Sequence, residues 1–161
     1  MNYETSSGSW VYDNNSSYAS TYGRLYDWET ANNVCPSGWH LPSDDEWKQL
    51  EMYLGMSQSD ADNTGWRGTD EGGKLKETGT TLWKSPNTGA TNESFFTAVP
   101  GGYRGYRNGG FYDVGNGGYW WSATEGGTND AWSRILYYSR IDVYRYDGYK
   151  RYGFSVRCLR D

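Results

Sequence analysis

Few residues in this chain could carry out chemistry, and their number limits what the chain can catalyse. There is one histidine, His40, and there are two cysteines, Cys35 and Cys158, in 161 residues. A single imidazole excludes metal sites built from several histidines and leaves no second candidate for a cysteine–histidine dyad. Because His40 stands between Trp39 and Leu41, just before a helix start signal, we expect it to be structural.

The carboxylates and the glycines give no catalytic pattern either. Asp44 and Asp45 are adjacent in the first turn of a predicted helix, where the helix dipole favours acidic residues. The glycines between Gly101 and Gly118 match neither a phosphate-binding loop nor a dinucleotide fingerprint. The sequence therefore predicts no catalytic residue, no metal ion and no cofactor.

Composition and charge indicate a folded protein rather than a disordered chain. Aromatic residues make up 18% of the chain, which is typical of a folded core and not of disorder. Residues 1–100 hold 6 basic and 14 acidic residues, whereas residues 101–161 hold 9 and 6. The later basic residues are scattered among tyrosines and glycines, so we expect no nucleic-acid partner. No apolar run is long enough to span a bilayer, so no membrane contact is expected.

The periodicity predicts helices early and strands late, and hence an α+β fold in one domain, 1–161. One helix is predicted from Asp27 to Cys35, and a second begins at Ser43 with an S-x-x-E capping box and ends at Leu54. Strands are predicted at 95–99, 119–123, 131–138, 141–145 and 154–158. Alternation predicts that these residues point into the core: Trp132, Leu136, Val143, Phe154 and Val156.

Four segments resemble the Fibrobacter succinogenes major paralogous domain. They are Trp28–Pro42, Gly101–Arg104, Tyr119–Thr124 and Gly153–Asp161, and Glu46-Trp47 follows the first of them. That family is similar to the C-type-lectin-like fold in the branch of the formylglycine-generating enzymes. The resemblance implies two helices flanking small twisted antiparallel sheets, with the N- and C-terminal strands paired. It also implies a disulfide between Cys35 and Cys158.

The active sites of the relatives do not carry over to this chain. Formylglycine-generating enzymes use a pair of cysteines near the C-terminal part of the chain, and here only Cys158 lies there. Sugar-binding C-type lectins hold calcium through two short motifs, of which Ser85-Pro86-Asn87 and Thr128-Asn129-Asp130 keep only fragments. We therefore expect a protein that is not an enzyme.

The C-terminal part of the chain resembles the variable proteins of diversity-generating retroelements, in which adenine-directed mutagenesis rewrites a lectin-like region. Residues 133–152 consist mostly of Ser, Tyr, Arg, Ile, Asp and Gly. An Asn codon whose two adenines have been replaced can code for each of these. The variable-looking region extends over about 129–152. An ordinary set of tyrosine-rich strands remains the alternative interpretation.

The same stretch has the composition of a recognition surface, since Tyr and Arg are enriched at binding hot spots and Tyr and Ser in antibody-like paratopes. Alternation and loop positions predict an exposed binding face. Its predicted residues are Ser133, Ile135, Tyr137, Ser139, Arg140, Asp142, Tyr144, Tyr146, Asp147, Tyr149, Arg151 and Tyr152.

These observations predict a ligand-binding domain of a displayed bacterial or phage protein. Its ligand would be a protein or glycan on a cell surface. The domain would lie outside the cell, exported by a segment not in this chain, or on a phage particle. Two alternatives remain open: a catalytic relative of the formylglycine-generating fold with a shifted active site, and a structural module of a secreted bacterial protein.

Overall fold

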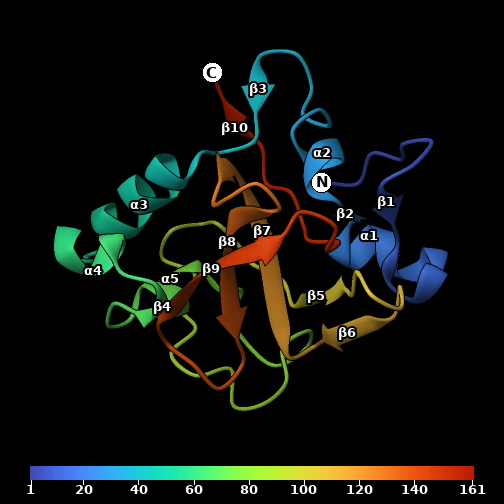
Figure 1. The fold of residues 1–161 in the computed structure, drawn as a ribbon. Coiled ribbons are helices and arrows are strands. Elements are labelled where there is room, and N and C mark those ends of the chain that lie inside the picture. The colour runs from blue at the N-terminus through green and yellow to red at the C-terminus, as the bar shows by residue number, and fades with distance from the viewer.

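The computed structural model describes residues 1–161 and shows an α+β fold with short helices and several sheets (Figure 1). The helices are α1 (Ala19–Tyr22), α2 (Trp28–Ala31), α3 (Asp44–Tyr53), α4 (Gln58–Asp62) and α5 (Glu71–Leu75), with 3-10 turns at Tyr12–Asn14 and Ser16–Tyr18. The strands are β1 (Ser9–Trp10), β2 (Leu25–Tyr26), β3 (Trp39–His40), β4 (Gly65–Arg67), β5 (Gly101–Arg104), β6 (Phe111–Val114), β7 (Gly117–Glu125), β8 (Asp130–Tyr137), β9 (Val143–Tyr149) and β10 (Leu159–Arg160). None of the helices is long and apolar enough to cross a bilayer.

One large sheet dominates the fold, with strand order β4-β9-β8-β7-β5-β6. Its longest strands, β7, β8 and β9, form two antiparallel pairs, β7–β8 and β8–β9, and follow each other in the chain. The β5–β7 pair is parallel, because Gly102 pairs with Gly118 in that direction. The expected antiparallel pairing therefore holds for the other pairs of this sheet but not for β5–β7.

The first and last strands do not pair with each other, which corrects the expectation that they would. β1 pairs with β2, and β10 pairs with β3. The two ends of the chain still meet, because the N-terminal amine of Met1 donates a hydrogen bond of 3.1 Å to the carbonyl oxygen of Val156. Each terminal strand has only two residues, so its pairing depends on the nearest available strand edge rather than on its own register.

Helix α3 begins where its capping box predicts. The Ser43 side chain accepts from the Glu46 amide, and the Glu46 carboxylate accepts from the Ser43 amide at 2.8 Å. These contacts satisfy backbone donors that the first helical turn would otherwise leave unpaired. Trp47 is then buried and donates from its indole to the carbonyl of Trp121 on β7, so the local signal also fixes how the helix packs on the sheet.

Three predicted elements are shorter or absent. α2 starts on the Asp27 cap but ends at Ala31, well before Cys35, because the side chains of Asn32 and Asn33 donate back to helix carbonyls and compete with the backbone. The predicted strand at 95–99 is wrong, since Phe95 and Thr97 have φ values of 56° and 54°, which a strand does not allow.

The predicted strand at 154–158 is also wrong. Phe154 and Ser155 form only isolated bridges, to Tyr26 and Trp120.

Buried residues cover both faces of the central strands. A cluster around Trp47, Trp83 and Trp120 lies on the α3 side, and a second cluster around Tyr26, Trp121 and Phe154 lies on the other. Leu136, Val143, Phe154 and Val156 are buried as predicted, whereas Trp132 is only half-buried and lies 3.7 Å below the Arg145 guanidinium. Because the sheet is covered on two sides, little of β8 is left to face solvent.

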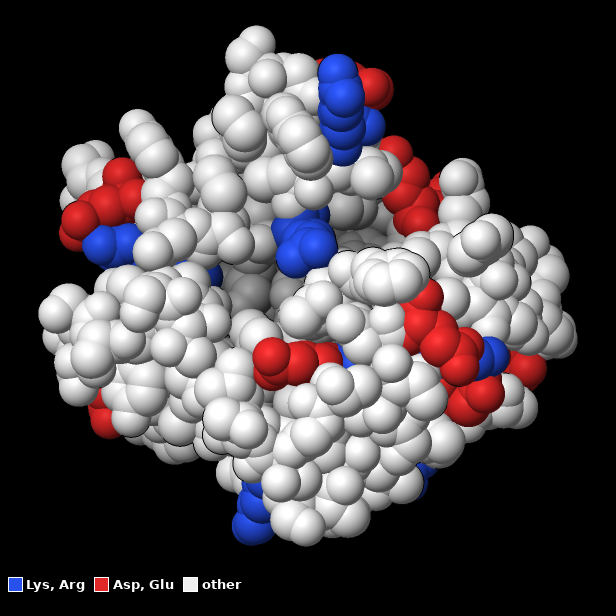
Figure 2. All heavy atoms as spheres, turned by 180° about the vertical axis from the view of Figure 1, so that it is seen from behind, with Lys and Arg blue, Asp and Glu red and all other residues white.

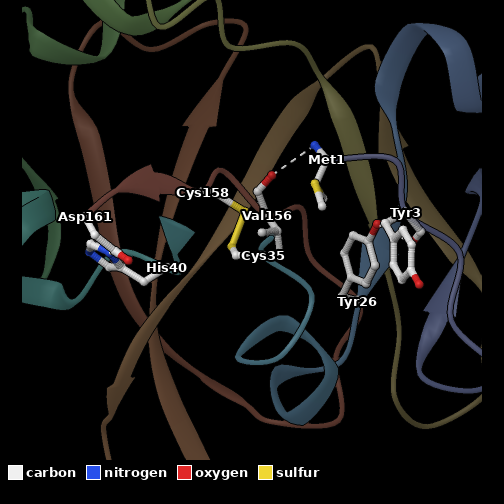
Figure 3. Close-up of a disulfide and its surroundings, with 8 residues drawn as sticks. All are labelled: Met1, Tyr3, Tyr26, Cys35, His40, Val156, Cys158 and Asp161. Atoms are coloured by element: carbon white, nitrogen blue, oxygen red, sulfur yellow. Dashed lines mark hydrogen bonds and ion pairs between the residues drawn. A yellow bond between two sulfur atoms is a disulfide. The ribbon is translucent and has the colours of Figure 1, made fainter. Parts of the chain in front are cut away.

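The predicted disulfide is present between Cys35 and Cys158, with 5.8 Å between the Cα atoms. It joins the segment after α2 to the segment before β10, and Met1 and Val156 lie beside it (Figure 3). On the other side, His40 on β3 contacts Asp161 at 2.6 Å and Glu46 at 2.9 Å. Hydrogen bonds that His40 donates to the carboxylates of Asp161 and Glu46 raise the pKa of His40.

Charged side chains are unevenly distributed over the surface. Figure 2 shows the back of the molecule, where acidic and basic groups lie at the top, at both sides and near the centre, and the lower part is mostly uncharged. On α3, the ammonium of Lys48 lies 2.9 Å from the Asp62 carboxylate. Such exposed mixed charges are solvated and contribute little to stability.

Candidate ligand-binding surface

The β8 part of the predicted binding face is partly internal. Ser133 has no exposed surface, and its hydroxyl donates to the Tyr146 carbonyl at 2.9 Å. The prediction that Ser133 points outward is therefore wrong. Ile135 is half-buried and packs against the cluster around Trp121. The reason is tertiary: β7 and β9 flank β8, and Phe154 and its neighbours cover the face that alternation assigned to solvent.

Two arginines of the variable-looking stretch are structural. Arg134 donates to Asp44 at 2.7 Å and to Glu51 at 2.6 Å, and all three side chains are buried. Arg145 donates to the same Asp44 carboxylate at 2.7 Å. Burial alone would raise the pKa of Asp44, but the bonds and charges of Arg145 and Arg134 lower it to about 2. Sequence composition alone did not separate these arginines from exposed ones.

The remaining predicted residues fall into three separate places. One group lies at the β8–β9 turn, where Arg140 donates to Asp142 at 2.9 Å and stacks 4.6 Å above Trp66. Ser139 joins Arg140 and Asp142 in lining a shallow cavity there. This turn is held from inside by the ammonium of Lys76, which donates to the carbonyls of Thr88, Tyr137 and Arg140.

The second group lies in the middle of the sheet. Tyr144 on β9 contacts Trp66 on β4 with 5.0 Å between ring centroids, and Tyr146 lies 6.1 Å from Tyr144. Tyr137 is half-buried at the end of β8, while Asp147 is exposed on β9. These residues line none of the larger cavities of the molecule.

The third group builds a cavity of about 400 Å³, which we call the tyrosine groove. Its lining residues are Tyr103, Gly105, Tyr106, Arg107, Asn108, Tyr112, Tyr149 and Tyr152. The Tyr106 ring centroid lies 4.9 Å from those of both Tyr149 and Tyr152. Thus Tyr149 and Tyr152, from the predicted face, meet a loop that the prediction did not include.

The groove rings are fixed by their neighbours. Tyr152 stacks on the buried Phe154 at 5.4 Å with 15° between the planes, and Tyr103 stacks on Tyr112 at 5.3 Å. Burial raises the pKa values of Tyr103 and Tyr152, so both hydroxyls stay protonated hydrogen-bond donors at neutral pH. A rigid aromatic wall of this kind loses little conformational entropy when a ligand binds.

Two further cavities adjoin the groove at Tyr106, and we call them the basic lobes. One, of about 330 Å³, is lined by Trp10, Asp27, Glu29, Arg104, Tyr106, Lys150 and Arg151. The other, of about 400 Å³, is lined by Glu29, Tyr106, Thr128, Asn129, Tyr149, Lys150 and Arg151. Tyr106 is therefore the one residue that all three cavities share.

The loop between β5 and β6 supplies the groove residues that sequence reasoning missed. The end of β5 and the start of this loop carry the tandem repeat Gly102-Tyr103-Arg104 and Gly105-Tyr106-Arg107. This repeat was a usable signal, because Tyr and Arg together mark recognition surfaces. Gly105, the first residue of the loop, is buried, and its amide donates to the Gly110 carbonyl, so the loop folds back and presents Tyr106 next to Tyr149.

The structure separates the two fragments of the calcium-lectin motifs. Asn87 is buried and donates to the carbonyls of Glu77 and Gly79, close to the segment in which the Thr88 amide donates to Tyr138 just after β8. Asn129 instead precedes the start of β8, where its carbonyl accepts from Lys150. The fragments lie at opposite ends of β8 and do not form one site.

Residues 1–160 match the family model of the Fibrobacter succinogenes major domain. The chain belongs to this family. No curated protein and no solved structure matches it. In this Fibrobacter succinogenes major domain, two of the motif segments support the candidate site directly. Gly101–Arg104 forms β5 at one side of the groove, and Gly153–Asp161 carries Phe154, on which Tyr152 stacks.

Proposed function

We propose that this Fibrobacter succinogenes major domain is a ligand-recognition domain and not an enzyme, and that it binds its ligand in the tyrosine groove and the basic lobes. The observation that carries the proposal is the position of Tyr106, which joins three adjoining cavities lined by tyrosines and basic side chains. Concave sites with convergent polar groups are the usual places for ligands. Tyr149 keeps 45% of its surface exposed, so it is available for contact.

The wider context of the proposal is a C-type-lectin-like domain displayed outside the cell or on a phage particle. The Cys35–Cys158 disulfide fits an extracellular protein. The ligand would be a protein or glycan on a cell surface, with no nucleic acid and no membrane contact by this domain. Diversification by a retroelement would act on the wall formed by Tyr149, Arg151 and Tyr152, while Tyr106 and its loop stay constant.

A binding experiment with matched variants tests the proposal. The labelled domain is applied to an array of defined glycans and purified bacterial surface proteins, and the bound signal is measured at each position. Tyr106→Ala and Tyr149→Ser should each weaken binding by tenfold or more, since truncated hot-spot tyrosines cost about 2 kcal/mol. Tyr53→Ser is the control, because Tyr53 on α3 is 87% exposed and outside the groove.

Circular dichroism and thermal unfolding establish that each variant is folded. Groove variants that bind as well as the wild type would contradict the proposal. So would a wild-type domain that binds no member of the array.

A further inference from the structure

Building on the proposed function, we infer that the ligand of the tyrosine groove and basic lobes is a carboxylate-bearing oligosaccharide. Three features carry this inference: an exposed arginine without an ion pair, aromatic walls and the kinds of side chain that line the cavities. Each is a property of residues around Tyr106.

The charge of the cavities is opposite to that of the protein. The chain has a net charge of −5, yet the three cavities are lined by Arg104, Arg107, Lys150 and Arg151 against only Asp27 and Glu29. A local surplus of positive charge attracts anionic ligands.

One of these cations, Arg151, is free to bind an anion. Lys150 is engaged with Glu125 at 2.6 Å, Arg104 stacks 4.1 Å above Trp10, and Arg107 donates from its Nε to the Tyr106 hydroxyl at 2.8 Å. Arg151 is exposed, and its guanidinium forms no ion pair. A guanidinium binds a carboxylate through two parallel hydrogen bonds. A ligand that carries a carboxylate within reach of Arg151 therefore gains the most affinity.

The walls suit a flat ring with one apolar face. Tyr112 and Tyr149 at the groove are 39% and 45% exposed, and each lies against other tyrosines that restrict its movement. The C–H face of a pyranose is apolar and packs on an aromatic ring, while its hydroxyls need polar partners. Asn108 in the groove and Thr128 and Asn129 in the adjoining lobe provide them.

The lining favours a sugar chain over a peptide. No leucine, isoleucine, valine, methionine or alanine lines any of the three cavities. A peptide ligand would have no pocket for aliphatic side chains, whereas a sugar has none to bury. Three connected cavities of about 330 to 400 Å³ match a short oligosaccharide better than a single ring.

Isothermal titration calorimetry with trigalacturonate tests the inference on the intact domain. Three comparison probes accompany it: the uncharged galactose trisaccharide, a hexaglutamate peptide and sodium acetate. Trigalacturonate should bind best, and raising the salt concentration from about 20 to about 200 mM should lower its affinity several-fold because screening acts on exposed charges. Arg151→Gln should lower the affinity for trigalacturonate about tenfold or more. Arg160→Gln, which changes an exposed arginine on β10, should leave the affinity unchanged.

The outcomes separate this inference from the proposed function. Equal binding of the uncharged trisaccharide would overturn the inference that the ligand carries a carboxylate. Preferential binding of hexaglutamate would overturn the inference that the ligand is an oligosaccharide. Loss of trigalacturonate binding in Tyr106→Ala but not in Arg151→Gln would also overturn the assigned role of the guanidinium. If the array detects a groove-dependent ligand but trigalacturonate does not bind, the inference fails and the proposed function stands.

Discussion

The Asp44 carboxylate on α3 and the Arg145 guanidinium on β9 form a buried ion pair with 2.7 Å between Oδ2 and Nη2, although 101 residues separate them. Arg134 on β8 donates to the other oxygen of the same carboxylate at 2.7 Å. This pair of contacts attaches the helix to the strands that carry the variable-looking stretch.

Removing one partner should destabilise the domain strongly. Arg145→Gln leaves the buried Asp44 carboxylate with fewer charged partners, and breaking a buried pair typically costs about 3 to 5 kcal/mol. Arg151→Gln, at an exposed position, should change the free energy of unfolding by less than about 0.5 kcal/mol. Urea unfolding followed by tryptophan fluorescence measures both; similar stabilities would show that the pair does not anchor α3.

Under the proposed diversification by a retroelement, the same contacts predict which codons stay constant. Arg134 and Arg145 are fixed by Asp44 and Glu51, so variation there would leave buried carboxylates unpaired. In the DNA, a near-identical repeat should differ at adenines in the codons of Tyr149, Arg151 and Tyr152 but not in those of the two buried arginines. Sequencing the gene and its neighbourhood checks this, and adenine differences at codon 134 or 145 would contradict it.

Acid should unfold the domain partly through Asp44. Its pKa is about 2 in the folded state, below the ordinary value of 3.8, so the ionised carboxylate stabilises the folded state above pH 4, and this contribution is lost as the pH falls towards 2. A difference of this size corresponds to about 2 kcal/mol. Carboxyl carbon NMR resolves the Asp44 titration directly, and a midpoint near 4 would refute the expected shift.

Lys76 should be a structural lysine with a low pKa. Burial lowers the pKa of its ammonium to about 8. Between pH 8 and 9.5 this lysine is therefore mostly neutral in the folded state but protonated in the unfolded chain. Its contribution to the free energy of unfolding becomes more stabilising as the pH rises. Lys76→Met should still destabilise by about 1 to 3 kcal/mol, because three carbonyls lose their donor. Lys84→Met, at an exposed position, is the control. Thermal unfolding measures both, and equal effects would refute a structural role.

The disulfide should make a large contribution to stability. Cys35 and Cys158 are 123 residues apart, and chain entropy gives about 5 kcal/mol for such a loop as an upper estimate. The double variant Cys35→Ser, Cys158→Ser should therefore unfold at a much lower urea concentration than the oxidised wild type. Thiol counting on unfolded, unreduced protein provides the direct check, and two free thiols would contradict the bond.

Local interactions determined what could be foreseen from the sequence. The start of α3 follows from Ser43 and Glu46, which bond to each other's backbone within one helical turn. The burial of Leu136 and Val143 follows from strand alternation on β8 and β9. Phe154 and Val156 are buried as predicted, although they lie outside the strands. The disulfide was implied by the family resemblance, and the family match bears out that resemblance.

Tertiary structure decided which side chains of the variable-looking stretch reach the surface. Alternation assigns Ser133 to solvent, but residues packed on both faces of the sheet cover β8. The sequence of β8 itself does not show that the second face is covered. Composition treats Arg134, Arg145 and Arg151 alike, although the first two meet Asp44 only because α3 packs on the sheet. Tyr106 and Tyr149 are likewise 43 positions apart in the sequence. Only the return of the β5–β6 loop beside the end of β9 brings their rings together.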